Sequence, residues 1–131
     1  MPRVIIVGVA QKTARPATPE EFVPPIEAMR DVAKLAAEDA GDSRLAGKLD
    51  AIHVVNILSW QPADAPTALA DALGAKPAVK EYTAVGGNSP QWLVNRVADN
   101  IGRGKTRLAL LAGCEVMHSL RLSAKMGRDI G

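Results

Sequence analysis

The sequence predicts an α/β domain in which helices cover a mostly parallel sheet, and three observations lead to this fold class. Apolar, β-branched runs recur without polar alternation, as in strands that are covered on both faces. Between these runs lie segments whose apolar residues repeat every three or four positions, the period of an amphipathic helix. Glycine and proline lie at the boundaries between these segments. The predicted order is β-α-β-α-β-α-β, a layered domain.

Length and composition fit one domain of this class. The chain has 131 residues, of which 47% are hydrophobic and 23% charged, and this excludes a disordered or collagen-like protein. Only 3% are aromatic, so aliphatic side chains and alanine must fill the core. We expect residues 1–120 to form the domain and residues 121–131 to begin a following loop region that is cut short.

The first predicted elements form a crossover unit. A strand from Val4 to Ala10 is expected to be the most buried strand of the sheet. A helix follows, with Pro25 in its first turn and Gly41 at its end. The second strand lies between Leu49 and Ser59. A strand, a helix and a parallel strand in this order make a right-handed connection in nearly all folds.

The second half continues the alternation. The remaining predicted elements are a helix from Ala65 to Leu73 closed by Gly74, a strand from Val79 to Val85, a helix from Ser89 to Ile101 stopped by Gly102 or Gly104, and a strand from Thr106 to Gly113. Ser89 followed by Pro90 is a typical helix start, a capping residue before proline in the first helical position.

Charge, hydropathy and cysteine content narrow the function classes. Sixteen basic and 14 acidic residues give a net charge of +2, and the basic residues are spread along the chain, which argues against nucleic-acid binding. The sequence contains no run of 18 apolar residues, so no membrane span is predicted, and the N-terminal segment does not fit a signal peptide. Cys114 is the single cysteine, so no disulfide forms within the chain, and a reducing, cytoplasmic setting is the simplest interpretation.

The turn after the third predicted strand is the strongest candidate site. Ligands of parallel sheets gather at the carboxyl ends of the strands. There, Gly86 and Gly87 permit a sharp turn, and Asn88 and Ser89 lead into a helix whose free N–H groups and positive dipole end would stabilise an anionic oxygen or a thiolate. The simpler interpretation is a tight strand-to-helix turn. The stretch matches neither the dinucleotide fingerprint nor the phosphate-loop motif.

Other chemistry-bearing residues have simpler interpretations. Cys114 ends an apolar strand and is expected to be a buried, unreactive thiol. Ser89 is expected to cap its helix, since no base lies near it in the sequence. His53 falls within the second strand. His118 follows Glu115 at three residues, and because two ligands do not make a metal site, none is predicted.

Three stretches together resemble the N-terminal part of the thiolase superfamily, and more narrowly its thiolase-like and sterol-carrier-type acetyl-CoA acetyltransferases. Val7 to Gln11 is similar to the family's opening strand. Gly86 to Gln91 lies where thiolases carry the Cys-Gly/Ala-Ser-Gly nucleophile turn. Leu111 to Met117 is similar to the family's Ala-Gly-Gly-x-Glu-Ser-Met stretch.

The resemblance implies a fold and a partner. The family's N-terminal half has strand order 3-2-1-4, and its third strand pairs with a twofold mate. Carried over, this makes the segment from Val79 to Val85 an edge strand and predicts a homodimer through it, or a complementary chain that supplies the missing half. The implied ligand is a CoA thioester, bound without a covalent cofactor.

The resemblance also implies that the nucleophile is missing. Placing Gln91 on the glutamine that often follows the family's nucleophile puts Gly86 at the cysteine position, and glycine cannot form a thioester intermediate. The family's two catalytic histidine turns and its late cysteine turn are not in this sequence. No catalytic residue is therefore predicted, and the implied substrate-binding residues are Gly86, Gly87, Asn88 and Ser89.

Three function hypotheses remain open. The first is the nucleophile-half fragment of a thiolase-like acyltransferase, inactive by itself. The second is a non-catalytic scaffold or interaction subunit that pairs with a complementary chain. The third is a free-standing nucleotide-binding domain, which has the least support because no phosphate-loop motif is present.

Overall fold

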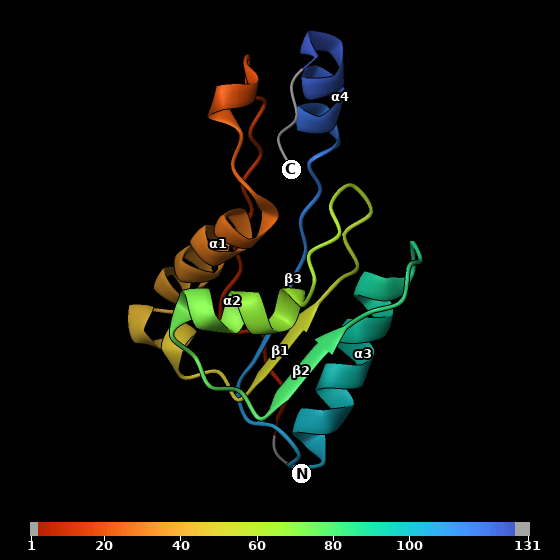
Figure 1. The fold of residues 1–131 in the computed structure, drawn as a ribbon. Helices are drawn as coiled ribbons and strands as arrows, with labels where there is room; N and C mark the ends of the chain where they lie inside the picture. Colours follow the sequence, from red (N-terminus) through yellow and green to blue (C-terminus); the bar gives the residue numbers. More distant parts are fainter. Residues whose placement is uncertain (1–2, 128–131) are drawn as a thin grey trace.

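The computed structural model describes residues 3–127, and they form a three-stranded sheet with helices on both faces (Figure 1). The helices and strands, in chain order, are α1 (Pro25–Asp39), β1 (Ala51–Val54), α2 (Ala65–Leu73), β2 (Val79–Tyr82), α3 (Ser89–Gly102), β3 (Ala109–Ala112) and α4 (Met117–Met126), with short 3-10 helices at Pro19–Glu21 and Ser43–Gly47. The predicted α/β class is confirmed.

The sheet is parallel throughout, in the order β2-β1-β3. Ala51 of β1 pairs with Val79 of β2 on one side and with Ala109 of β3 on the other. All four residues of β1 are buried, whereas β2 and β3 are more exposed. The strand with both edges paired is therefore the second strand of the sequence prediction, not the first.

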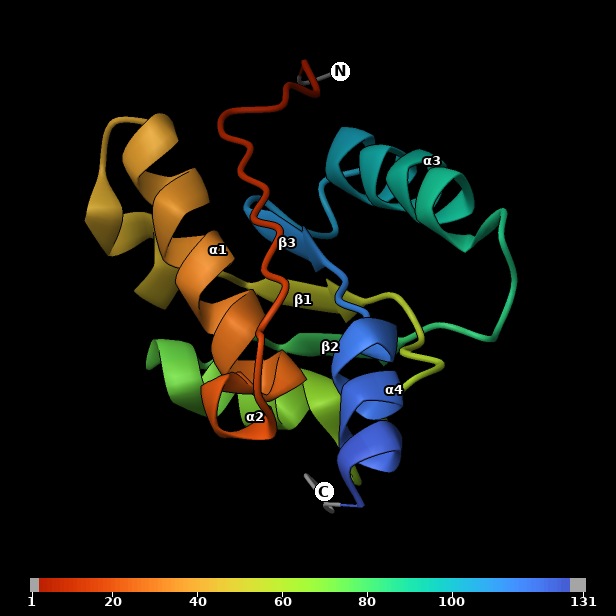
Figure 2. The same cartoon turned by 90° about the horizontal axis from the view of Figure 1, so that it is seen from above.

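Helices α1 and α2 cover one face of the sheet, and α3 lies on the other (Figure 2). Ile52 and Val54 of β1 belong to the main core cluster, together with Met29 of α1 and Leu69 of α2. All four side chains are fully buried. The helix ends follow local chemistry: Gly74 closes α2 in the left-handed conformation, with φ of 69°.

A buried histidine on the α3 face connects three elements. His53 of β1 is 1% exposed, and its Nδ1 lies 2.7 Å from Oε1 of Glu81, its register partner on β2. The other oxygen of Glu81 lies 3.5 Å from Nη1 of Arg96 on α3. His53 Nε2 has no partner among the described residues. The pairing with Glu81 gives one nitrogen of the buried His53 ring a partner, and the more exposed ion pair of Glu81 with Arg96 links β2 to α3.

The prediction of a buried first strand is wrong. The segment from Val4 to Ala10 is extended but belongs to no strand, and Ile5 and Ile6 are 70% and 79% exposed. The expected order 3-2-1-4 holds for the neighbours β2 and β1, but β3 pairs directly with β1 where the first strand was expected. The apolar pattern reports strand-forming tendency, whereas the place of a strand depends on long-range pairing, and both edges of β1 are taken by β2 and β3.

The loop expected over residues 121–131 is also corrected. Residues 121–126 belong to α4, which ends at Gly127 in the left-handed conformation, with φ of 67°. Residues 128–131 of the predicted loop lie outside the described residues. None of the helices in residues 3–127 combines the length and the apolar character that crossing a membrane requires.

Candidate functional site

The turn of Gly86, Gly87, Asn88 and Ser89 connects β2 to α3 at the carboxyl end of the sheet. Ser89 is buried; its N–H donates to the carbonyl of Gly86 at 3.1 Å, and its hydroxyl donates to the carbonyl of Ala84 at 3.0 Å. The expected capping role of Ser89 is therefore wrong. Asn88 occupies the N-cap position and makes no capping hydrogen bond with its side chain. The Ser89 hydroxyl instead connects the helix start to the segment that follows β2.

Three backbone N–H groups at this turn are free to bind a ligand. Within the described part of the chain, the backbone N–H groups of Gly87, Asn88 and Gln91 donate no hydrogen bond, because they precede the first N–H groups that bond within α3. Pro90, which lies between them, has no backbone N–H. The N-terminus of the 14-residue helix α3 adds its positive dipole end. This arrangement can stabilise negative charge that develops on an oxygen.

Glycine is not required at position 86 by the backbone. Positive φ angles occur at Gly41, Gly74, Gly104 and Gly127 but not at Gly86. A Cβ placed on Gly86 would lie 2.9 Å from Oδ1 of Asn88, which is the end of an exposed side chain and can rotate away. A side chain at this position is therefore sterically possible.

The loops beside the turn are braced by contacts that the sequence did not predict. Asn56, which follows β1, donates its N–H to the Thr83 hydroxyl and its Nδ2 to the Thr83 carbonyl, both at 3.0 Å. The Ile57 N–H donates to the Tyr82 hydroxyl at 2.9 Å. Oδ1 of Asn56 is buried without a partner among the described residues. These bonds fix the end of β2, from which the glycine turn departs.

Glu115 forms a second brace, between the ends of β1 and β3. Its carboxylate accepts hydrogen bonds from the N–H groups of Leu58 and Ser59, at 2.7 and 3.0 Å, and from the Ser59 hydroxyl. The Ser59 hydroxyl oxygen in turn accepts from the N–H of Val116 at 2.7 Å. The one sequence signal for this role was the position of Glu115 within the family-like stretch from Leu111 to Met117.

Two cavities occupy other parts of the described structure. One, of about 520 Å³, lies between residues 3–10 and β3, with α1 and α3 beside it. The other, of about 430 Å³, lies near Lys12, Cys114 and His118. Neither is lined by the turn at Gly86, so the candidate site is an open surface turn, with the apolar side chains of Val85 and Trp92 exposed beside it.

Cys114 and the histidines do not gather into a second centre. Cys114 is half-buried after β3, His53 is bonded to Glu81, and Nε2 of His118 lies 3.1 Å from the carbonyl oxygen of Pro16. Among residues 3–127, no three histidine, cysteine, aspartate or glutamate side chains are grouped so that they could hold a metal ion.

We expect Cys114 to alkylate slowly. Burial, and next the negative charge of Glu115, raise the pKa of its thiol above the ordinary value of 9.0, so less of the reactive thiolate is present at a given pH. The rate constant with iodoacetamide at pH 8 should be at least about threefold below that of N-acetylcysteine, and it should still be rising above pH 9. Equal rates, or a plateau below pH 8, would contradict this.

Comparisons with known proteins locate the fold. No protein-family profile matches the chain, and no curated protein matches it. Among solved structures, the chain is similar to a monomeric SCP2-thiolase-like protein type 1 from Mycobacterium smegmatis, with 28% identity and a TM-score of 0.72 over 86% of this chain. It is also similar in fold to 3-oxoacyl-[acyl-carrier-protein] synthase III from Aquifex aeolicus VF5, with 18% identity and a TM-score of 0.60 over 80% of this chain.

The matched regions are only part of those two proteins. The chain spans 23% of the Mycobacterium smegmatis protein and 32% of the Aquifex aeolicus protein. Both have thiolase-superfamily folds, so the resemblance drawn from the sequence is confirmed for the fold. The chain corresponds to a partial thiolase-like fold.

Proposed function

We propose that this chain, whose fold is that of part of the thiolase superfamily, is the nucleophile-half part of a thiolase-like protein that handles acyl-CoA thioesters, with Gly86 in place of the nucleophilic cysteine. The observation that carries the proposal is the position of the turn from Gly86 to Ser89. It joins β2 to the N-terminus of α3 in a fold similar over 86% of the chain to an SCP2-thiolase-like protein.

The chemistry of the turn supports binding without covalent transfer. A thioester carbonyl oxygen placed above the turn would accept hydrogen bonds from the free N–H groups of Gly87 and Asn88. An acyl-enzyme intermediate needs a nucleophilic side chain, and Gly86 has none. The buried Ser89 hydroxyl is engaged with the carbonyl of Ala84 and does not replace it. On this proposal the chain positions and polarises a thioester, and any acyl acceptor comes from elsewhere.

We expect weak binding of acetyl-CoA, with a dissociation constant on the order of 1 mM, because Gly86, Gly87 and Asn88 are exposed and neither of the two cavities described above is lined by them. Isothermal titration calorimetry should show acetyl-CoA binding about threefold more tightly than CoA, since only the thioester has the carbonyl oxygen. No heat with either compound at millimolar concentration would contradict thioester handling by this chain.

A pair of variants tests whether the N–H groups are responsible. Asn88 has φ of −86°, close to the range that proline allows, so Asn88→Pro removes one N–H with little strain. Asn88→Ala removes the side chain and keeps the N–H. We expect only the proline variant to lose the preference for acetyl-CoA over CoA. Equal preference in both variants would assign the effect to another part of the chain.

The alternative is a non-catalytic scaffold or interaction subunit, and one observation favours it. The backbone at residue 86 does not require glycine, which fits a nucleophile position whose side chain has been given up. Such a subunit would pair with a complementary chain, or with a second copy through the segment from Val79 to Val85, whose strand β2 lies at the sheet edge. The Mycobacterium smegmatis protein is described as monomeric, which favours the complementary chain.

Co-purification and light scattering separate these partners. A second polypeptide bearing the missing histidine turns would support a split acyltransferase. A stable homodimer that neither binds CoA nor transfers acyl groups would support the scaffold.

We further propose a cytoplasmic location, because the single cysteine fits a reducing compartment.

A further inference from the structure

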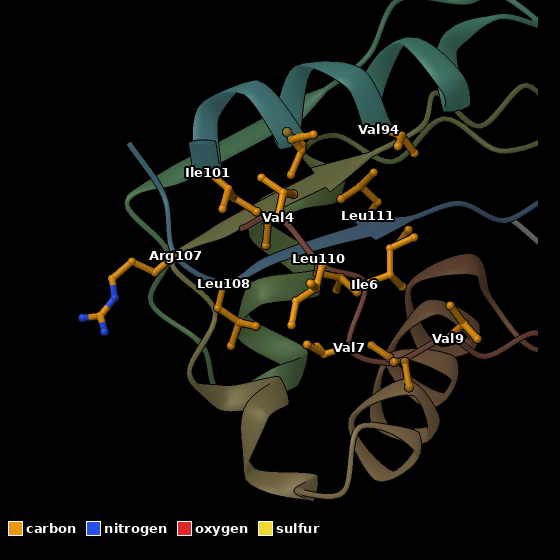
Figure 3. Close-up of a pocket in the computed structure, with 18 of the residues that line it drawn as sticks. Val4, Ile6, Val7, Val9, Val94, Ile101, Arg107, Leu108, Leu110 and Leu111 are labelled. Atoms are coloured by element: carbon orange, nitrogen blue, oxygen red, sulfur yellow. The ribbon is translucent and has the colours of Figure 1, made fainter. Parts of the chain in front are cut away.

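A groove lies between residues 3–10 and strand β3, away from the glycine turn (Figure 3). It encloses about 520 Å³, within the range of roughly 300–1,000 Å³ that is typical of ligand sites. Figure 3 shows Val4, Ile6 and Val7 of the N-terminal segment and Leu110 and Leu111 of β3 around the same space. Side chains of α1 and α3 complete the lining, which is apolar except for Arg3 and Arg107.

Both long walls of the groove are extended backbones with unpaired polar groups. In the described chain, residues 4–10 make no backbone–backbone hydrogen bond, and the N–H of Val9 donates to Oδ2 of Asp39 at 2.9 Å. Strand β3 pairs with β1 alone, so its outer edge is open. Open strand edges are templates for a further strand, because their N–H and C=O groups need partners.

Positive charge marks one end of the groove. Arg3 and Arg107 line it at the end where β3 begins, and neither forms an ion pair among the described residues. In Figure 3 the Arg107 guanidinium extends beyond Leu108, outside the apolar lining. The carboxylate of Asp50 lies near but is occupied by the N–H groups of Arg107 and Leu108, both at 2.9 Å. A bound carboxylate would find two cations here.

We propose that this groove binds an extended, apolar peptide strand that carries an aspartate or glutamate at the end beside Arg107. The peptide backbone supplies the donors and acceptors that both walls lack, its apolar side chains cover the exposed segment, and its acidic residue complements the arginines. An alkyl carboxylate would match the apolar lining and the charge, but it would bury the edge N–H and C=O groups without partners. The groove is a peptide-interaction surface, separate from the thioester function proposed above.

Two synthetic peptides test the proposal on the whole chain. Each is a fluorescein-labelled peptide of alternating valine and threonine, with aspartate at both ends in one and lysine at both ends in the other. By fluorescence anisotropy the acidic peptide should bind at least about tenfold more tightly. Arg107→Glu should reverse the preference. Ile6→Pro, which removes one N–H from the wall, should weaken binding at least about fivefold, whereas Ile6→Thr should not.

Hydrogen exchange gives a readout that needs no variant. On saturation with the acidic peptide, the amides of residues 4–10 and of β3 should become protected. The proposal is overturned if the amides of residues 4–10 are already protected in the free chain, or if neither peptide binds below 1 mM. It is also overturned if dodecanoate binds in a way that depends on Arg107 while the peptides do not bind. Acetyl-CoA binding is not involved in any of these measurements, so the two proposals fail or stand separately.

Discussion

A thiol introduced by Gly86→Cys, in a Cys114→Ser background, is expected to react with iodoacetamide at pH 7 at least about tenfold faster than Cys114 does in the natural chain. The introduced thiol would lie at the N-terminus of α3, beside the free N–H groups of Gly87 and Asn88, and this environment lowers a thiol pKa. Burial beside Glu115 does the opposite to Cys114. The backbone at position 86 accepts a side chain once Asn88 rotates.

The same variant tests the proposed nucleophile position at residue 86. With acetyl-CoA, the introduced thiolate would attack the thioester carbonyl, forming a new sulfur–acyl bond and releasing the CoA thiolate, which takes up a proton. Mass spectrometry should detect one added acetyl group that hydroxylamine removes. Asn95→Cys in the same background places a thiol in the exposed middle of α3 and is the matched control. Equal alkylation and acetylation of both thiols would argue against a nucleophile position at residue 86.

Glu115→Ala is expected to lower the free energy of unfolding by about 2 kcal/mol. The carboxylate accepts three hydrogen bonds from Leu58 and Ser59, and its removal leaves two backbone N–H groups and a buried hydroxyl without their acceptor. The loss stays moderate because Glu115 is exposed and water partly replaces the lost contacts. Urea denaturation followed by circular dichroism gives the change, with the m-value held constant.

Two comparisons make the Glu115 result interpretable. Glu115→Gln keeps one oxygen acceptor and should lose about half as much stability. Glu38→Ala removes an exposed carboxylate from α1 and should change the free energy of unfolding by less than about 0.5 kcal/mol. If Glu115→Ala were as stable as Glu38→Ala, the brace between the ends of β1 and β3 would not contribute to folding.

Local sequence signals predicted α1, α2 and α3 well, whereas α4 lies partly where a loop was expected. Pro25 marks the start of α1, and Gly74 ends α2 in the left-handed conformation that glycine adopts most readily. These helix boundaries depend on the backbone preferences of one or two residues, and those preferences follow directly from the residue types in the sequence. The start of α3 was located correctly, but the cap was assigned to Ser89. A serine hydroxyl at a helix start can accept from a helix N–H or donate to a carbonyl, and the sequence does not show that the carbonyl of Ala84 is near.

Long-range pairing could not be predicted in the same way. The segment from Val4 to Ala10 has the composition of a buried strand, yet its place depends on which edge of β1 is free, and β3 arrives at that edge from more than 50 residues away. The contacts of Glu115 with Leu58 and of His53 with Glu81 likewise join distant parts of the chain. The candidate turn could be found from the sequence because its residues are contiguous. The hydrogen bonds that brace the neighbouring loops could not, because they join residues that are far apart in the chain.

The central position of β1 also sets an order of events during synthesis. When Ala51–Val54 leaves the ribosome, neither β2 nor β3 has been made, and among the helices of the described core α1 precedes it while α2 follows it. The edge toward β2 closes after residue 82, and the edge toward β3 waits until residue 112. Because closing such loops costs entropy before any contact forms, the sheet is completed late, and the nascent chain passes through an interval in which its most buried strand is exposed to chaperones.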